Sequence, residues 1–191
     1  NAPALESVNF SINKGKKVAV VGPNGGGKST LFNAIAGLIP LTEGSLTIKG
    51  KSPEDAKGTV SYVPQKDLMN WNFPLSVKQV VEMGLTNRNT ISIFKRKKIN
   101  NKIEKALENV GLLEKINENI KSLSGGQLQR VLIARALAQD ADILLLDEAF
   151  SAVDVGAQED IMQLINNINL DGKTILIATC LLYTSDAADE Q

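Results

Sequence analysis

Residues 22–30 read Gly-Pro-Asn-Gly-Gly-Gly-Lys-Ser-Thr and fit the pattern G-x-x-x-x-G-K-[ST]. The preceding residues, Val18 to Val21, form a short apolar, partly β-branched run, which is typical of a strand buried in a parallel sheet. Spacing of i, i+3, i+4 and i+7 after the loop predicts a helix whose inner face carries Leu31, Ala34, Ile35 and Leu38. A glycine-rich loop between strand and helix points successive N–H groups at phosphate oxygens, aided by the positive end of the helix. The alternative is a turn that only joins the two elements.

The residue types in this loop indicate a nucleotide. Lys28 would reach the β and γ phosphates, and Ser29 would hold Mg²⁺. We expect nine residues to line the phosphate site: Gly22, Pro23, Asn24, Gly25, Gly26, Gly27, Lys28, Ser29 and Thr30. The loop does not say what the nucleotide is used for.

Length and charge bound the partners. A chain of 191 residues suits one domain, or a domain with a subdomain. Its 21 basic and 21 acidic residues balance, so no global field attracts nucleic acid or anionic lipid. No run approaches the roughly 18 apolar residues of a membrane span, and no signal peptide is evident, so we expect a soluble, cytosolic chain. Cys180 is the only cysteine and cannot form an internal disulfide.

Short apolar segments predict several strands. Val8, Phe10 and Ile12 alternate with polar residues, as in a half-buried strand. Further strands are expected at 45–48, 59–63, 143–146 and 174–178, and Gly37 and Pro40 should end the first helix. Strands that alternate with helices favour a largely parallel sheet covered on both faces.

Amphipathic spacing predicts four more helices. Ser76 is the expected N-cap of the first, and Gly111 should stop the second. The inner faces carry Val77, Val80 and Val81; Ile99, Ile103, Ala106, Leu107 and Val110; Leu128, Val131, Leu132 and Ala136; and Ile161, Leu164, Ile165 and Ile168. We interpret the basic residues 95–98 as a solvated loop and helix start, because a nucleic-acid patch would interleave aromatic residues.

Two further groups carry chemistry. Residues 123–127, Leu-Ser-Gly-Gly-Gln, stand at a helix start and make either a second anion site or a plain N-cap. Asp147 and Glu148 end a buried strand, so one carboxylate can face a metal while the other faces a water. The alternative for this pair is a solvated acidic turn.

Together with Gln65 and the stretch 151–154, Ser-Ala-Val-Asp, these motifs resemble in order and spacing the ABC transporter ATPase family over residues 2–179. Leu-Ser-Gly-Gly-Gln between a phosphate loop and an Asp-Glu strand is close to diagnostic. The resemblance implies an α/β fold with a P-loop core, a mainly parallel sheet, N-terminal antiparallel strands and an inserted helical subdomain. It places the core at 1–66 and 140–179 and the subdomain at about 67–139.

The resemblance also implies a role for each residue. ATP and Mg²⁺ are the expected cofactors; Ser29, Gln65 and Asp147 hold the metal, Asp147 through water, and Glu148, Gln65 and Lys28 serve catalysis. Head-to-tail pairing of two copies is expected. Five residues would then meet the nucleotide of the second copy or the interface around it: Ser124, Gly125, Gly126, Gln127 and Asp154.

The stretch from Val63 to Gly84 looks more specifically like the ATPases of manganese, zinc and iron importers. Trp71 and Phe73 would then receive a coupling helix of a membrane permease, or else fill the subdomain core. Expected partners are permease subunits and an extracytoplasmic metal-binding protein, with no nucleic acid, which places the chain on the cytoplasmic side of the membrane. Alternatives are an ABC ATPase of the exporter type or for another transport substrate, and a non-transport ABC protein that acts on nucleic acid.

Four features depart from the family pattern. Ala149 replaces the usual proline, and Cys180 replaces a histidine that bonds the γ phosphate; a thiol is a weak donor. Residues 180–190 lose every family feature and resemble a translated sequencing adapter, so we expect the natural sequence to diverge after Thr179 and 180–191 to be a non-native tail. The aromatic that stacks on adenine is also missing upstream of the first strand. We therefore expect weak ATP binding and poor turnover from this chain.

Overall fold

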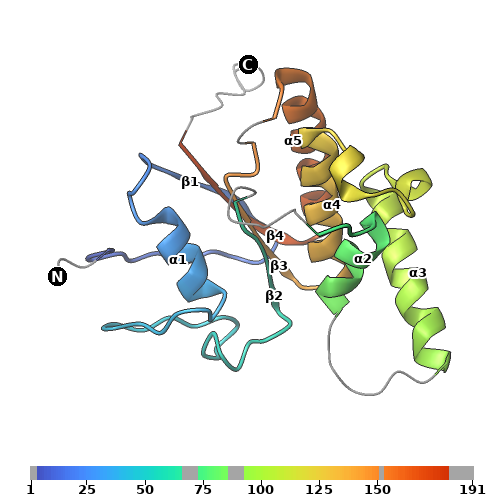
Figure 1. The fold of residues 1–191 in the computed structure, drawn as a ribbon. Coiled ribbons are helices and arrows are strands. Elements are labelled where there is room, and N and C mark those ends of the chain that lie inside the picture. The colour runs from blue at the N-terminus through green and yellow to red at the C-terminus, as the bar shows by residue number, and fades with distance from the viewer. Residues whose placement is uncertain (1–3, 66–72, 86–92, 151–152, 181–191) are drawn as a thin grey trace, which may run out of the picture.

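A computed structural model describes residues 4–65, 73–85, 93–150 and 153–180, with side chains in 93–95 left out. Within these ranges four parallel strands form one sheet in the order β1-β4-β3-β2 (Figure 1). The strands are β1 (Lys17–Val21), β2 (Val60–Val63), β3 (Ile143–Asp147) and β4 (Thr174–Thr179). The expected strands at 18–21, 59–63, 143–146 and 174–178 are therefore confirmed within a residue or so. Leu144, Leu145 and Leu146 are buried on both faces, as the continuous apolar run of β3 requires.

Helices cover both faces of the sheet. Figure 1 shows α1 on one side and α4 and α5 on the other, with α2 and α3 outside α4. The α-helices are α1 (Lys28–Ile35), α2 (Val77–Glu82), α3 (Ile93–Asn109), α4 (Gly125–Ala138) and α5 (Val155–Leu170). Short 3₁₀ turns are η2 (Met83–Leu85), η3 (Leu113–Lys115) and η4 (Ile120–Ser122).

The predicted helix boundaries follow from local chemistry. Ser76 caps α2 in a reciprocal capping box with Gln79, in which each side chain accepts a hydrogen bond from the other residue's N–H. Gly111 has φ 69°, the left-handed conformation that ends α3. Both predictions of a helix end are confirmed.

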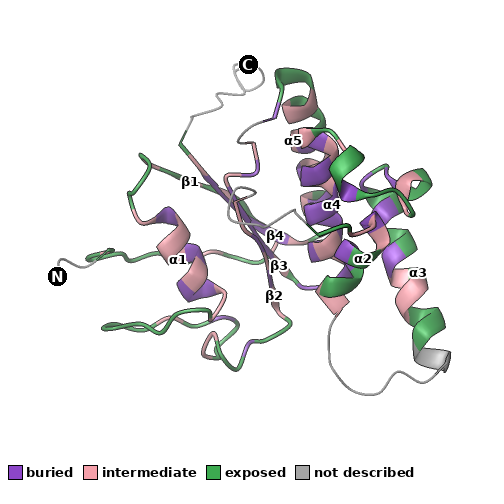
Figure 2. Cartoon of the chain, in the orientation of Figure 1, coloured by how far each residue is buried: buried purple, intermediate pink, exposed green. Residues whose placement is uncertain are grey.

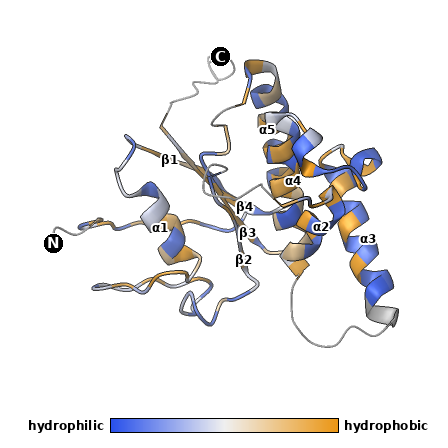
Figure 3. Ribbon diagram, viewed as in Figure 1, coloured by the Kyte–Doolittle hydropathy of each residue, from blue (hydrophilic) through white to orange (hydrophobic). Residues whose placement is uncertain are grey.

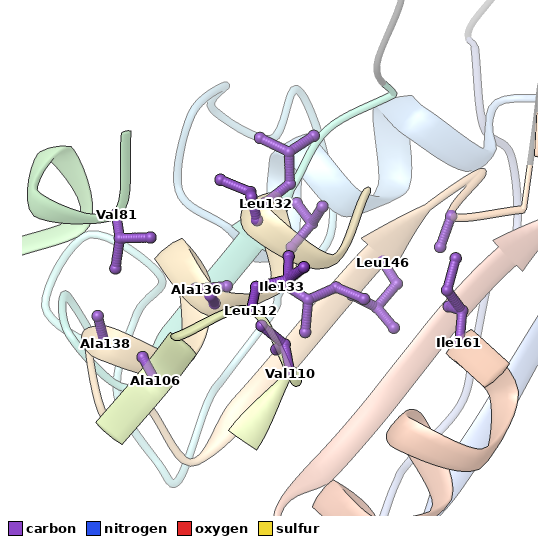
Figure 4. Packing of buried hydrophobic residues seen from close by; sticks show 14 of the residues in the cluster. Val81, Ala106, Val110, Leu112, Leu132, Ile133, Ala136, Ala138, Leu146 and Ile161 are labelled. Atoms are coloured by element: carbon purple, nitrogen blue, oxygen red, sulfur yellow. The ribbon is translucent and has the colours of Figure 1, made fainter. Parts of the chain in front are cut away.

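The larger hydrophobic core lies on the α4 and α5 face of the sheet. It runs without a break from α2 and α3 through α4 to the sheet and α5. Figure 4 shows Leu132, Ile133 and Ala136 of α4 near the middle of this cluster, with Val81 to one side and Leu146 and Ile161 to the other. Figure 2 shows the same distribution, with buried purple segments concentrated along α4, α5 and the sheet.

The smaller core lies under α1. It is built from Phe32, Ile35, Ile48, Ala56, Leu145, Leu176 and Ala178. Leu145 of β3 and Leu176 of β4 pair with one another across the two strands and face α1. In the described part of the chain this face of the sheet carries one helix, α1, so its covering layer is thinner than that of the other face.

Two expected strands do not form. The structure shows no strand among residues 4–16, and Val8 and Phe10 are about half exposed, at 48% and 52%. Residues 45–48 contribute only a single antiparallel bridge between Ile48 and Lys51. The predicted strand at 8–12 and the implied N-terminal antiparallel strands are therefore wrong for the described residues. An alternating segment becomes a strand only where another strand accepts its hydrogen bonds, and none in the described ranges does so here.

The first helix is also shorter than its hydrophobic spacing predicts. It ends at Ile35, Gly37 adopts φ 67°, and Leu38 is 62% exposed rather than on the inner face.

The basic stretch 95–98 lies within α3, where Arg96, Lys97 and Lys98 are exposed. Figure 3 shows hydrophilic blue along much of α3 and hydrophobic orange along the sheet.

Candidate nucleotide-binding site

The carboxyl ends of all four strands meet at one edge of the sheet, because the strands are parallel. At this edge β4 lies between β1 and β3. The Gly22 N–H donates to the Thr179 carbonyl oxygen at 3.4 Å, and the Glu148 N–H donates to the Ala178 carbonyl oxygen at 3.0 Å. The topology therefore gathers the phosphate loop after β1, the acidic pair after β3 and Cys180 after β4.

Lys28 lies across the phosphate loop. Its side chain is buried, with 6% of the residue exposed, and its ammonium donates to the carbonyl oxygens of Gly22 and Pro23, both at 2.8 Å. The loop folds tightly beneath it, since the Gly26 N–H donates to the Pro23 carbonyl oxygen at 3.1 Å. Among the described residues, neutral carbonyl oxygens hold this buried ammonium, which makes it a strong binding site for an anion that enters the loop.

Gly27 forms the N-cap of α1 and needs to be glycine for two reasons. Its φ is 83°, and a Cβ there would lie 2.6 Å from the Ala4 carbonyl oxygen. No side chain caps this end of α1, and its first turn holds no acidic residue. The N–H groups of the first turn are thus not taken up by a side-chain cap and suit a phosphate. Ser29 and Thr30 are partly buried in this turn, and Asn24 and Gly25 are exposed in the loop.

Asp147 is completely buried at the end of β3. Its Oδ2 accepts a hydrogen bond at 2.9 Å from the hydroxyl of Tyr62 on β2. Its Oδ1 is buried and has no hydrogen-bond partner among the described residues. Burial and the Asp147 carboxylate raise the pKa of Tyr62 well above its ordinary value, so this hydroxyl remains a donor.

Glu148 breaks the strand that Asp147 ends. Its φ is 49°, a left-handed conformation that costs a non-glycine residue about 1–3 kcal/mol and occurs often at functional sites. Glu148 is partly buried, whereas Asp147 has no exposed surface, so the two carboxylates lie in different environments. The interpretation as a solvated acidic turn is therefore wrong for Asp147. Ala149, in place of proline, is fully buried.

Gln65 stands two residues after the end of β2 and is partly buried at the same sheet edge. Residues 66–72, including Trp71, lie outside the described ranges. Phe73 is 63% exposed. The alternative that this aromatic fills the subdomain core is therefore wrong for Phe73.

Ser124 caps α4, as expected from the sequence. Its hydroxyl accepts from the Gln127 N–H at 3.2 Å, and Gln127 Oε1 accepts from the Ser124 N–H at 3.0 Å. Within one chain this corner is thus an N-cap; whether it also binds a second copy's phosphate stays a prediction. Ser124 itself is exposed, which leaves its hydroxyl accessible.

The N-termini of α4 and α5 are in close contact. A Cβ on Gly126 would lie 2.8 Å from the Ala157 Cβ, so only glycine fits there. Asp154 caps α5 by accepting from the Ala157 N–H at 2.9 Å. Arg130 of α4 also forms an ion pair with Asp160 of α5. The structure therefore holds the residues of the 123–127 corner and Asp154 as one unit.

Sequence reasoning missed three of these contacts. Tyr62 as the partner of Asp147, Ala157 as the neighbour of Gly126, and the Arg130–Asp160 pair all join segments far apart in sequence. The one available signal was Tyr62 itself, an aromatic with a polar tip near the end of a buried strand, whose hydroxyl would need a partner.

A cleft of about 300 Å³ is lined by Phe150, Gln158, Glu159, Met162 and Gln163. It has no counterpart among the predicted site residues. Among the described helices, none is long and apolar enough to pass through a membrane.

A parallel α/β sheet with a phosphate loop after β1 and a buried aspartate at the end of β3 defines a nucleotide-binding enzyme of the P-loop class. A profile of the ABC transporter family matches residues 5–151. The manganese transport system ATP-binding protein MntB of Bacillus subtilis is 41% identical over 96% of this chain and 74% of its own length. The zinc transport system ATP-binding protein TroB of Treponema pallidum is 39% identical over 92% of this chain and 66% of its own length. This chain belongs to the ABC transporter family, as an ATP-binding ATPase subunit.

Solved structures give the same result. A dimeric ATP-binding cassette in a post-hydrolysis state, bound to ADP and phosphate, matches with a TM-score of 0.74 and 34% identity, over 92% of this chain and 79% of that one. The family resemblance drawn from the motifs is therefore confirmed, as is the mainly parallel α/β fold.

Proposed function

We propose that this chain is the ATP-hydrolysing subunit of an importer for divalent metal ions, in which ATP-driven closure of two copies moves a membrane permease. Its similarity to ATP-binding proteins named for manganese and zinc transport supports the substrate class. The observation that carries the catalytic part is the sheet edge, where the phosphate loop with Lys28 follows β1, and where Asp147 and Glu148 stand at the end of β3. We also propose the division into a core at 1–66 and 140–179 and a helical subdomain at about 67–139.

The residues at the edge fit Mg²⁺. Asp147 Oδ1 is a buried anionic oxygen without a hydrogen-bond partner in the described ranges, and Mg²⁺ prefers oxygen ligands and keeps several waters. Ser29 would bind the ion through its hydroxyl, Asp147 would hold one of its waters, and Gln65 would complete the site from β2. When bound, Mg²⁺ neutralises charge on the β and γ phosphate oxygens.

Each protein group then has a specific task. The loop N–H groups from Gly22 to Gly27 orient the phosphates, and Lys28 exchanges its two carbonyl acceptors for phosphate oxygens. Glu148 accepts the proton of the attacking water, while Gln65 orients that water. Proton abstraction by a positioned carboxylate contributes about 10²- to 10⁴-fold in rate.

The second copy completes the site. We propose that Ser124, Gly125, Gly126 and Gln127 of one chain meet the γ phosphate bound by the other, with Asp154 at the same interface. The exposed Ser124 hydroxyl and the packing of Gly126 against Ala157 support this, because they present both elements as one preformed surface. Charge brought by both chains surrounds the transferred phosphoryl group.

On the partners, we propose that the exposed Phe73 belongs to the surface that receives the permease. The chain would then sit on the cytoplasmic side of the membrane, attached through the permease. A metal-binding protein outside the membrane would deliver the ion, and no nucleic acid takes part. Co-purification with a multi-span permease, followed by uptake of Mn²⁺ or Zn²⁺ into vesicles that contain both, tests this assignment.

The two-copy site is tested by ATP-induced pairing. In a Glu148→Gln background, which slows hydrolysis, sedimentation velocity should show a dimer when ATP and Mg²⁺ are added. Ser124→Phe should abolish that dimer, because a bulky ring fills the space of the γ phosphate. Ser45→Phe, a matched change at another exposed serine, should leave pairing intact. Undiminished pairing with Ser124→Phe would overturn the proposed dimer.

A further inference from the structure

Tyr62 and Asp147 face the same side of the sheet. Tyr62 on β2 pairs in register with Leu145 on β3, and side chains alternate along a strand, so Asp147, two residues later, points to the same face. This is the α1 face, where the Tyr62 ring packs partly buried against the cluster that contains Leu145 and Phe32. The ring is thus held by packing, and only its hydroxyl extends toward the sheet edge.

The hydroxyl meets one specific carboxylate oxygen. It donates to Asp147 Oδ2 at 2.9 Å, while Oδ1 of the same residue has no partner in the part of the chain that the structure describes. A fully buried carboxylate can rotate about its last torsion and exchange its oxygens unless one of them is fixed. The two oxygens are therefore unequal in this fold, and the inequality comes from Tyr62.

We propose that Tyr62 is a positioning residue for the metal: it anchors Oδ2 of Asp147 so that Oδ1 alone faces Mg²⁺ and its bound water. This inference rests on the proposed role of Asp147 toward Mg²⁺. Groups that orient a metal-binding side chain in this way commonly contribute tenfold or more to metal affinity. Tyr62 does not touch the nucleotide in this scheme and acts only through Asp147.

The variant Tyr62→Phe keeps the ring and removes the hydroxyl. The measurement is the midpoint of the Mg²⁺-dependent rise in Tm when MgCl₂ is titrated into the 191-residue chain saturated with ATP. The expected result is a midpoint about tenfold higher in MgCl₂, with ATP binding in EDTA unchanged. A midpoint equal to that of the unaltered chain would overturn the inference.

Ser61→Ala is the matched control. Ser61 precedes Tyr62 on β2, and its buried side chain lies on the opposite face of the sheet, under α4. Its hydroxyl has no hydrogen-bond partner among the described residues. Removing this hydroxyl should leave the Mg²⁺ midpoint unchanged. A shift as large as that of Tyr62→Phe would show that any change in β2 disturbs the site, and would count against a specific role of Tyr62.

Asp147→Asn separates this inference from the proposed function. If Asp147→Asn abolishes the response to Mg²⁺ while Tyr62→Phe leaves the midpoint in place, the metal role of Asp147 stands and the role of Tyr62 fails. If Asp147→Asn retains the full response, the assigned metal role fails and the inference falls with it. When both changes weaken Mg²⁺ binding, Tyr62→Phe should have no further effect in the Asp147→Asn background.

A second measurement tests the inference without substituting Tyr62, so it does not require that a Tyr62 variant folds. The chain holds two tyrosines, Tyr62 and Tyr183, so 3-fluorotyrosine labelling gives two ¹⁹F signals that Tyr183→Phe assigns. MgCl₂ added to the ATP-saturated chain should move the Tyr62 signal, because the charge beside its hydroxyl changes. An unmoved signal under conditions where Tm shows Mg²⁺ binding would contradict the inference.

Discussion

The two faces of the sheet are built differently. The face under α4 and α5 is part of one continuous core that reaches α2 and α3, whereas the face under α1 holds a small cluster and leaves nearby Val8, Phe10 and Leu38 exposed. The buried Lys28 and Asp147 and the partly buried Tyr62 belong to the thinner face or its edge. The thicker face, under α4 and α5, positions the N-termini of these two helices, which Ser124 and Asp154 cap.

The two faces therefore contribute to different properties: the face under α4 and α5 mainly stabilises the fold, and the face under α1 with its edge mainly provides the residues for ATP turnover. Substitutions at the carboxyl edge should change ATP turnover with little effect on the free energy of unfolding. Substitutions in the continuous core should do the opposite. A substitution at the edge that mainly lowers the free energy of unfolding, or one in the core that mainly lowers turnover, would contradict this division.

The largest expected effect comes from Glu148→Gln. Because the amide cannot accept the proton of the attacking water, single-turnover ATP hydrolysis should fall by about 10²- to 10⁴-fold. The free energy of unfolding, from urea denaturation, should change by less than about 1 kcal/mol since the side chain is not in the core. Glu159→Gln, the same change on the exposed surface of α5, is the control and should leave hydrolysis intact. Equal rates for Glu148→Gln and the unaltered chain would remove Glu148 from catalysis.

Next in size is Ile161→Ala in the thick core. Ile161 has no exposed surface, so truncation leaves a cavity and should cost about 2–5 kcal/mol in the free energy of unfolding. Leu38→Ala, which truncates an exposed side chain on the α1 side, should cost no more than about 0.5 kcal/mol. Urea denaturation measures both. Similar costs for the two changes would mean that the faces do not differ as described.

Cys180→His should improve function. Cys180 is exposed beside the edge, directly after β4 and between the segments that begin with Gly22 and Glu148. An imidazole there can donate to the γ phosphate, and one such donor is commonly worth about 10²-fold in rate. Single-turnover hydrolysis should rise, whereas Cys180→Ala should leave the rate low. A histidine variant no faster than the alanine variant would argue against this position.

The smallest effect concerns pH. The ammonium of Lys49, which donates to Asp142, lowers the pKa of that carboxyl below its ordinary value. Because the folded pKa is the lower one, the pair stabilises the fold above the unfolded pKa near 4 and the contribution disappears as the pH falls through the folded value. Both side chains are about half exposed, so the effect should be small and weaker in salt. Plots of Tm against pH for Asp142→Asn and the unaltered chain should converge as the pH falls through the folded pKa of Asp142. A difference that persists at lower pH has another cause.

Local patterns predicted most of the fold. The apolar run 143–146, the capping box at Ser76 and the stop at Gly111 each depend on neighbouring residues, and each is confirmed. The strand predicted from the alternation of Val8, Phe10 and Ile12 does not form, because a strand also needs a partner strand that its own sequence does not specify. The prediction that Leu38 lies on the inner face of the first helix is wrong because the helical periodicity was extended past Gly37, whose left-handed φ ends the helix.

The candidate site divides in the same way. Contiguous motifs gave the phosphate loop, the Ser124 corner and the acidic pair. The contacts of Tyr62 with Asp147 and of Gly126 with Ala157 depend on strand register and on helix packing across the fold. No single stretch of sequence contains that information.

Mixing two inactive variants tests the shared site most directly. Lys28→Ala disables the phosphate loop, and Ser124→Phe disables the opposing corner, so each variant alone should hydrolyse almost no ATP. A head-to-tail pair of one chain of each kind has one intact site, so the mixture should regain part of the turnover of the unaltered chain. A mixture no more active than its two components, measured at equal total concentration, would contradict the account.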